Sequence, residues 1–143
     1  VSNFPSKLLK EAAQLSEAPL ITDQVEYHPY LSQQAVLQTL RDMGAALTAW
    51  SPIAQGRVVK DPVLNAIGAA HGKSATQVTL RWLIQQEGVI AIPRTTNAGR
   101  AAENLAVFDF SLTDAEMAAI FDLAEPNGRI GDWIDPVFEW DKR

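Results

Sequence analysis

Short apolar runs and longer amphipathic segments alternate along the chain. Three runs predict β-strands, at residues 20–26, 46–50 and 89–92. The segments between and after them have apolar residues at helical spacing, and they predict helices over about 7–16, 33–43, 62–71, 75–87, 99–105 and 114–123. Strands and helices in strict alternation predict a parallel α/β sheet with right-handed crossovers.

Several helix boundaries carry recognisable capping signals. Ser6 and Ser32 are predicted to cap the first two helices, and Asp61 precedes a proline at the first position of the third. Ser74–Gln77 and Thr113–Glu116 read as capping boxes for the next long helix and for the last one.

The two ends of the chain and its last strand give further expectations. Residues 1–4 read as the tip of a strand running into a loop, so the chain is expected to begin within a strand–loop unit. Val89–Ile92 is apolar on both faces, which predicts a strand buried on both sides. Trp82 is expected in the core, and the tail from residue 126 onwards is expected to be irregular.

Each predicted strand is followed by polar or aromatic residues. The four clusters are Ser2-Asn3, Glu26-Tyr27-His28, Trp50-Ser51 and Arg94-Thr95-Thr96. The carboxyl ends of parallel strands share one rim, and that rim carries function in α/β folds. Turn residues are polar in most proteins, so one such cluster alone is weak evidence, and four in succession favour a site.

Composition narrows the function classes. The chain has 143 residues, no cysteine and a formal net charge of -5, which exclude disulfides and thiolate catalysis and argue against general nucleic-acid binding. No apolar run approaches the roughly 18 residues of a membrane span. We therefore expect a cytoplasmic protein with no membrane or nucleic-acid partner. Acidic residues are scattered, and no metal site is expected.

Four stretches together resemble the aldo-keto reductase family, in particular bacterial enzymes similar to 2,5-diketo-gluconate and methylglyoxal reductases. They are residues 1–4, 23–29, 49–56 and 92–105. The resemblance covers essentially the whole chain and implies the C-terminal half of a (β/α)8 barrel: the tip of strand five, strands six to eight with their helices, and the C-terminal tail. Residues 1–143 would then form one partial barrel, and the N-terminal half would lie outside this chain.

The resemblance also implies NADPH as cofactor and assigns residues to it. Ser2, Asn3 and Gln24 match the family residues that hold the nicotinamide carboxamide, and such side chains supply the donors and acceptors that an amide needs. The ring of Trp50 would stack on the nicotinamide. Residues matching the pyrophosphate and ribose path are Ser51, Ile53, Gln55 and Gly56, those matching the 2′-phosphate site are Arg94, Thr95 and Arg100, and those matching the adenine end are Glu103 and Asn104. The family often has Lys where Arg94 stands, so the strictness of the NADPH preference stays open.

The same resemblance places the catalytic Asp, Tyr, Lys and His in the other half, so no catalytic residue is predicted here. Tyr27 and His28 are adjacent and would point to opposite faces of a strand, which favours a structural role. Trp133 is a candidate for the substrate pocket, because the family tail lines that pocket; ordinary packing is the alternative.

Three functions remain open. The first is part of an NADPH-dependent reductase of aldehydes and ketones, with a small carbonyl substrate and with the missing half or a second copy as partner; the chain alone would be inactive. The second is a non-catalytic nucleotide-binding fragment or cofactor-sensing module. The third, disfavoured by residues 24–29, is another barrel enzyme that binds a phosphorylated substrate.

Overall fold

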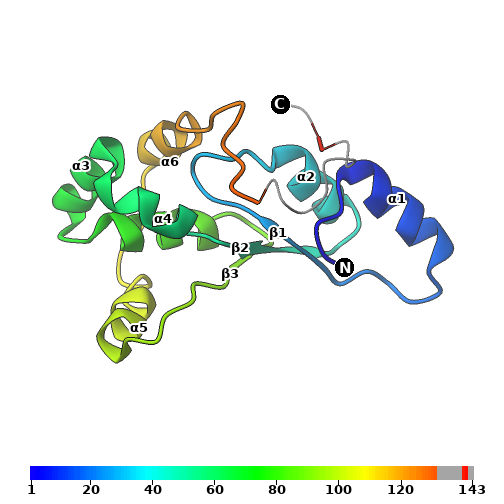
Figure 1. The fold of residues 1–143 in the computed structure, drawn as a ribbon, viewed down its shortest axis with the longest axis horizontal. Coiled ribbons are helices and arrows are strands. Elements are labelled where there is room, and N and C mark those ends of the chain that lie inside the picture. Colours follow the sequence, from blue (N-terminus) through cyan, green and yellow to red (C-terminus); the bar gives the residue numbers. More distant parts are fainter. Residues whose placement is uncertain (132–139, 142–143) are drawn as a thin grey trace.

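The computed structural model describes residues 1–131 and 140–141 (Figure 1). Three strands form a parallel sheet in the order β1 (Thr22–Glu26), β2 (Ala46–Trp50) and β3 (Val89–Ala91). The helices are α1 (Ser6–Leu15), α2 (Gln34–Asp42), α3 (Pro62–His71), α4 (Ala75–Ile84), α5 (Ala98–Leu105) and α6 (Asp114–Phe121). The predicted parallel α/β arrangement is therefore confirmed.

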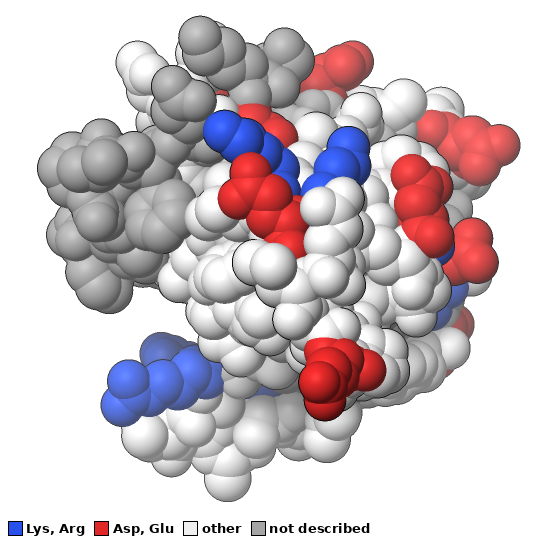
Figure 2. Space-filling model, turned by 90° about the vertical axis from the view of Figure 1, so that its right-hand side faces the viewer, with Lys and Arg blue, Asp and Glu red and all other residues white. Residues whose placement is uncertain are grey.

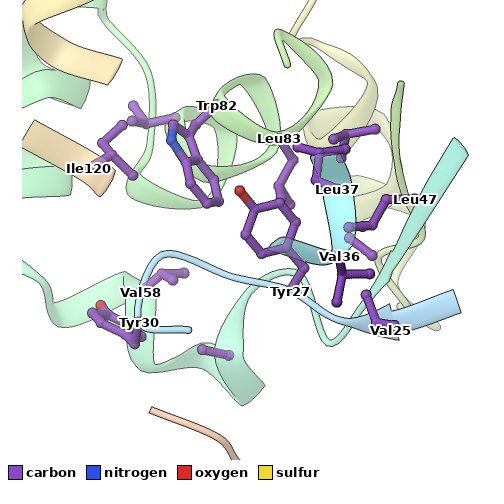
Figure 3. Packing of buried hydrophobic residues seen from close by; sticks show 14 of the residues in the cluster. Val25, Tyr27, Tyr30, Val36, Leu37, Leu47, Val58, Trp82, Leu83 and Ile120 are labelled. Atoms are coloured by element: carbon purple, nitrogen blue, oxygen red, sulfur yellow. The ribbon is translucent and has the colours of Figure 1, made fainter. Parts of the chain in front are cut away.

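One face of the sheet packs against helices. Val25, Leu47, Ala49 and Val89 point to that face and are buried. Figure 1 shows α2 and α4 on this side of the sheet, with α5 set apart at the lower left. Figure 3 shows the Tyr27 ring between Trp82 and Leu83 on one side and Val36 on the other. Because these side chains come from both covering helices, the core joins them to β1, and the core position predicted for Trp82, which is 1% exposed, is confirmed.

The other face of the sheet is covered by no described helix, and it is exposed at its β3 edge. Gln24, Thr48 and Ile90 lie in one row across the three strands, and Ile90 is 49% exposed. Ile92, just beyond β3, is 42% exposed. The prediction that Val89–Ile92 is buried on both sides is therefore wrong for this chain, because none of the described helices covers this face and β3 is the last strand of the sheet.

The observed helix caps agree with some of the capping signals in the sequence and differ from others. Both capping boxes form as predicted, Asp61 accepts from the N–H groups of Val63 and Leu64, and Gly72 ends α3 in the left-handed conformation. The predictions for Ser6 and Ser32 are wrong. Pro5 and Gln33 hold the N-cap positions of α1 and α2, and neither makes a side-chain capping bond. Proline already favours the extended backbone that a cap residue needs, so Ser6 lies inside the first turn of α1.

Sequence periodicity missed a 3-10 segment after β2. It is η1 (Ala54–Lys60), interrupted at Gln55 and Gly56, where φ is positive. Such a turn has neither the period of a strand nor that of an α-helix, so the pattern gave no sign of it. No helix among the described residues is long and apolar enough to cross a membrane.

Candidate functional site

A shallow, open pocket of about 370 Å³ lies at the carboxyl ends of β1 and β2. Its lining brings together six of the residues predicted to hold a cofactor: Ser2, Asn3, Gln24, Trp50, Ser51 and Gln55. The backbone of residues 1–3 is fixed there by parallel pairing with β1, because Asn3 N–H donates to the Gln24 carbonyl and Gln24 N–H donates to the Val1 carbonyl. The expected strand tip at residues 1–4 thus appears as a bridge beside β1.

Asn3 and Trp50 are held in a defined geometry at this pocket. Trp50 Nε1 donates to Asn3 Oδ1 at 2.9 Å, which fixes the plane of the indole ring and uses the amide oxygen as acceptor. The Asn3 Nδ2 group and the Gln24 amide provide donors and an acceptor next to that ring. Gln24 and Trp50 project from the same face of neighbouring strands, in the register Gln24–Thr48 and Glu26–Trp50. An aromatic face beside amide groups suits a planar ligand that carries an amide.

Several residues around the pocket have backbone angles in the left-handed region, with positive φ. Asn3, Ser51, Ala54 and Gln55 have φ between 47° and 59°, and Gly56 has φ of 91°. Non-glycine residues in this region carry a conformational cost, and they cluster at functional sites because the surrounding structure holds them there. Ser51 and Gln55 reach the pocket lining from this strained turn. Ile53 and Gly56 belong to the same turn but do not line the pocket.

Sequence reasoning missed two residues of the lining, Ile130 and Gly131. Their backbone N–H groups donate to the two carboxylate oxygens of Glu26, at 2.6 and 2.8 Å. His28 Nε2 donates to the same carboxylate at 2.9 Å, and both side chains are fully buried. Burial pushes the pKa of Glu26 upward, but the hydrogen bonds from His28, Ile130 and Gly131 outweigh it and lower that pKa. A carboxylate at the end of a predicted apolar strand was the only sequence signal for this contact.

The predicted phosphate and adenine residues lie outside this pocket, on the connection from β3 to α5 and on α5 itself. Arg94 and Arg100 are exposed, and Figure 2 shows Lys and Arg side chains projecting at its lower left. Asn97 caps α5 by accepting from Arg100 N–H, and Thr95 Oγ1 accepts from Asn97 N–H. A cation beside a helix N-terminus is an arrangement that suits an anion.

Glu103 faces α4 in this structure. Its carboxylate accepts from Ser74 Oγ at 2.7 Å, while its backbone carbonyl accepts from Gln77 Nε2. Asn104 on the same helix is half-buried. Trp133, the candidate for the substrate pocket, lies outside the described residues.

The two tyrosines of the chain are engaged inside it. Tyr27 is buried, its hydroxyl donates to Gln86 Oε1 at 2.7 Å, and burial raises its pKa. The Tyr30 hydroxyl donates to Asp61 Oδ2 at 2.9 Å. Neither hydroxyl faces the pocket described above, and among residues 1–131 and 140–141 no group of three His, Asp or Glu residues could hold a metal ion.

A larger hollow of about 900 Å³ lies between the start of α2 and residues 121–129 and 140–141. None of the residues predicted to bind a cofactor lines it. The smaller pocket is the candidate site, because the predicted amide, hydroxyl and aromatic groups converge there.

Comparison with known proteins finds similarity along most of the chain. The model of the aldo/keto reductase family matches residues 1–125. Glyoxal reductase of Bacillus subtilis is 38% identical over 131 residues, which are 92% of this chain and 47% of that protein. The chain thus spans about half the length of the curated relatives it matches.

Two solved structures extend the similarity to the fold. The crystal structure of a protein assigned as a 2,5-diketo-D-gluconic acid reductase B superposes with a TM-score of 0.93 at 52% identity, over 98% of this chain and 50% of that one. An aldo-keto reductase of Bombyx mori, solved in complex with NADP, gives a TM-score of 0.82 at 32% identity, over 94% and 48% of the two chains.

Proposed function

Because the chain belongs to the aldo/keto reductase family, we propose that it is part of an NADPH-dependent oxidoreductase that reduces aldehydes or ketones to alcohols. The observation that carries this proposal is the convergence of Ser2, Asn3 and Gln24 beside the Trp50 ring, in one pocket at the carboxyl ends of the strands. The cofactor supplies a hydride for the carbonyl carbon of a small substrate. Relatives that bind NADP and reduce glyoxal support the same reaction class.

The residues of the pocket fit a nicotinamide. Gln24 and the Asn3 Nδ2 group would hold the carboxamide, and Ser2 would complete the set of donors and acceptors. Trp50, fixed by its bond to Asn3, would present a flat apolar surface to one face of the nicotinamide ring and so decide which face meets the substrate. Ser51, Ile53, Gln55 and Gly56 would follow the pyrophosphate and ribose.

We further propose that this chain is the C-terminal half of a (β/α)8 barrel, and that the other half supplies the catalytic Asp, Tyr, Lys and His. The sheet has three strands with exposed Ile90 and Ile92 at the β3 end, and unpaired strand edges invite pairing. The partner for these edges would be the N-terminal half or a second copy of the chain. The sheet face that no described helix covers would then become the barrel interior.

The second candidate, a nucleotide-binding fragment or cofactor-sensing module, is favoured by one observation. Both tyrosine hydroxyls donate within the chain and neither faces the pocket, so this chain offers no phenol to protonate a carbonyl oxygen. Carbonyl-dependent NADPH oxidation by the chain with its N-terminal half, and none by the chain alone, distinguishes a part of an enzyme from a sensor.

The proposal predicts that NADPH quenches the fluorescence of Trp50. Titration of the protein with NADPH should give a saturable loss of tryptophan emission, and Trp50→Phe should remove most of that loss. 2′,5′-ADP, which lacks the nicotinamide, serves as the ligand control and should quench little. Equal quenching in Trp50→Phe and in the unmodified protein would contradict the assignment of this pocket to the nicotinamide.

A second prediction concerns the phosphate end. Arg94 and Arg100 are exposed cations near the N-terminus of α5, and a 2′-phosphate would accept charge-assisted hydrogen bonds worth roughly 1.5–3 kcal/mol each. NADH lacks this phosphate, so it should bind on the order of ten times more weakly than NADPH.

The variant Arg94→Ala should therefore weaken NADPH far more than NADH. The measurement is a pair of dissociation constants for each protein. Lys60→Ala, an exposed cation at the end of η1, is the control for a general loss of charge. An equal loss of affinity for both cofactors in Arg94→Ala would show that this residue does not contact the 2′-phosphate.

A further inference from the structure

The fully buried Glu26 carboxylate connects two segments that are far apart in sequence. It belongs to β1, and the residues that it binds, Ile130 and Gly131, lie 104 and 105 positions further along the chain. Both carboxylate oxygens are used, one by each backbone N–H, and His28 adds a third donor. The Glu26 side chain therefore fixes the position of the backbone of residues 130 and 131 relative to the end of β1.

This contact lies directly behind the candidate site. Glu26 is the neighbour of Trp50 in the sheet register and lies on the same face of β1 as Gln24. Ile130 and Gly131 line the pocket together with those two residues. The position of the pocket wall relative to the Trp50 ring is thus determined by the hydrogen bonds to Glu26.

The hydrogen bonding of Glu26 and His28 suits a side chain that holds the backbone of residues 130 and 131 in place. Ionised carboxylates only accept hydrogen bonds, and three N–H donors satisfy the buried charge of Glu26. His28 Nδ1 has no hydrogen-bond partner among the described residues, and the ring packs against Tyr30 at 5.9 Å between centroids. The His28 ring is therefore held by packing and by one bond, which it gives to Glu26.

We propose that Glu26, supported by His28, is a positioning residue that holds the Ile130–Gly131 wall of the cofactor pocket in place and thereby sets the affinity for the nicotinamide end of the cofactor. The inference rests on the proposed reductase function. Glu26 is fully buried and does not line the pocket, so it acts through the backbone of residues 130 and 131. Its loss should displace this wall and leave the hydrogen bond between Trp50 and Asn3 in place.

The test uses Glu26→Gln, which keeps the size of the side chain but turns one acceptor into a donor. Glu116→Gln is a matched control, because Glu116 also pairs with a histidine, His71, at 2.8 Å, and it lies on α6 in a capping box that glutamine can satisfy. Amide hydrogen exchange of residues 130 and 131 is measured in this chain. In the full-length reductase that contains it, the Kd for NADPH and the Kd for 2′,5′-ADP, which lacks the nicotinamide, are measured.

We expect Glu26→Gln to accelerate exchange at residues 130 and 131 tenfold or more and to raise the Kd for NADPH about tenfold, with the Kd for 2′,5′-ADP within a factor of two. Glu116→Gln should change none of these three quantities. Unchanged exchange in Glu26→Gln would overturn the anchor. Faster exchange with an unchanged Kd for NADPH would overturn its role in cofactor affinity.

A second variant covers the case in which Glu26→Gln fails to fold. Ile130→Pro removes a donor to the carboxylate and leaves the buried pair intact. It should reproduce the raised Kd for NADPH, and a wild-type Kd in this variant would overturn the proposal. If the unmodified protein fails to bind NADPH, the proposed function fails, while the exchange experiment still decides whether Glu26 anchors this segment.

Discussion

Replacing Gly128 by alanine should detach the segment that follows α6 from the end of β1. A Cβ atom at this position would lie 1.7 Å from the carbonyl oxygen of Tyr30 and 2.6 Å from its carbonyl carbon. These are backbone atoms, and the same carbonyl accepts from Glu125 N–H at 3.0 Å, so it cannot turn aside without breaking the turn at 125–128. Overpacking typically costs 1–3 kcal/mol, and we expect a loss of about 3 kcal/mol here.

The substitution Gly128→Ala should loosen residues 130 and 131 more than the rest of the protein. The hydrogen bonds from Ile130 and Gly131 to Glu26 come just after this turn, so Gly128→Ala should raise amide exchange at those two residues and lower the midpoint of urea denaturation. Asn127→Ala, an exposed change in the same turn, is the control and should be nearly neutral. A Gly128→Ala protein with unchanged exchange at Gly131 would show that the turn does not hold this segment.

Replacing Asp23 by asparagine should stabilise the protein at neutral and alkaline pH. Asp23 lies in β1 and is fully buried; Phe4 N–H donates to Oδ1 at 3.5 Å, and Oδ2 has no hydrogen-bond partner among the described residues. Burial raises the pKa of this carboxyl from 3.8 to about 6, and the bond from Phe4 offsets only part of that rise. The charged form is therefore disfavoured in the folded state.

The sign of the pH dependence follows from these two values. The folded state holds the proton more tightly than the unfolded chain, so the stability from Asp23 is fully present below pH 3.8 and is lost as the pH rises through about 6. A rise of this size corresponds to about 3 kcal/mol at pH 8. Asparagine carries no charge but brings an amide group that needs partners, so the net gain for Asp23→Asn should be about 1–2 kcal/mol.

The measurement is urea denaturation at pH 4 and pH 8 for the unmodified protein and for Asp23→Asn. The variant should be the more stable protein at pH 8, and its advantage should shrink at pH 4. Asp122→Asn, an exposed change at the end of α6, is the control for an altered net charge. The same difference in stability between the two pH values in all three proteins would contradict a raised pKa at Asp23.

The sequence predicted those parts of the molecule whose signals are local. The capping boxes at Ser74 and Thr113 and the cap at Asp61 depend on neighbouring residues, and they formed as expected. Burial of a whole strand depends on what covers it, and apolar Ile90 could not reveal that one face of the sheet is exposed at its β3 edge. Pro5 holds the cap position in place of Ser6, and its ring already favours the extended backbone that this position needs.

In the candidate site, too, the residues identified by local motifs were predicted and the long-range contact was not. Family motifs identified Asn3, Gln24 and Trp50, and the structure brings these three together. The contact between Glu26 and residues 130–131 joins positions more than 100 apart, and no periodicity or spacing signals such a pairing. The residues assigned to the phosphate and adenine, from Arg94 to Asn104, stay predictions of the resemblance, because the pocket does not reach them.

The order of the strands also bears on how the protein folds. Each strand pairs with the next one along the chain: α2 separates β1 from β2, and η1, α3 and α4 separate β2 from β3. The connection that must close before the second pairing is about twice as long as the first, but doubling the length of a loop adds only about 0.6 kcal/mol to the entropic cost of closing it. Folding can proceed by adding one βα unit at a time to the free edge, as in repeat proteins, so the sheet can grow while the ribosome is still extending the chain.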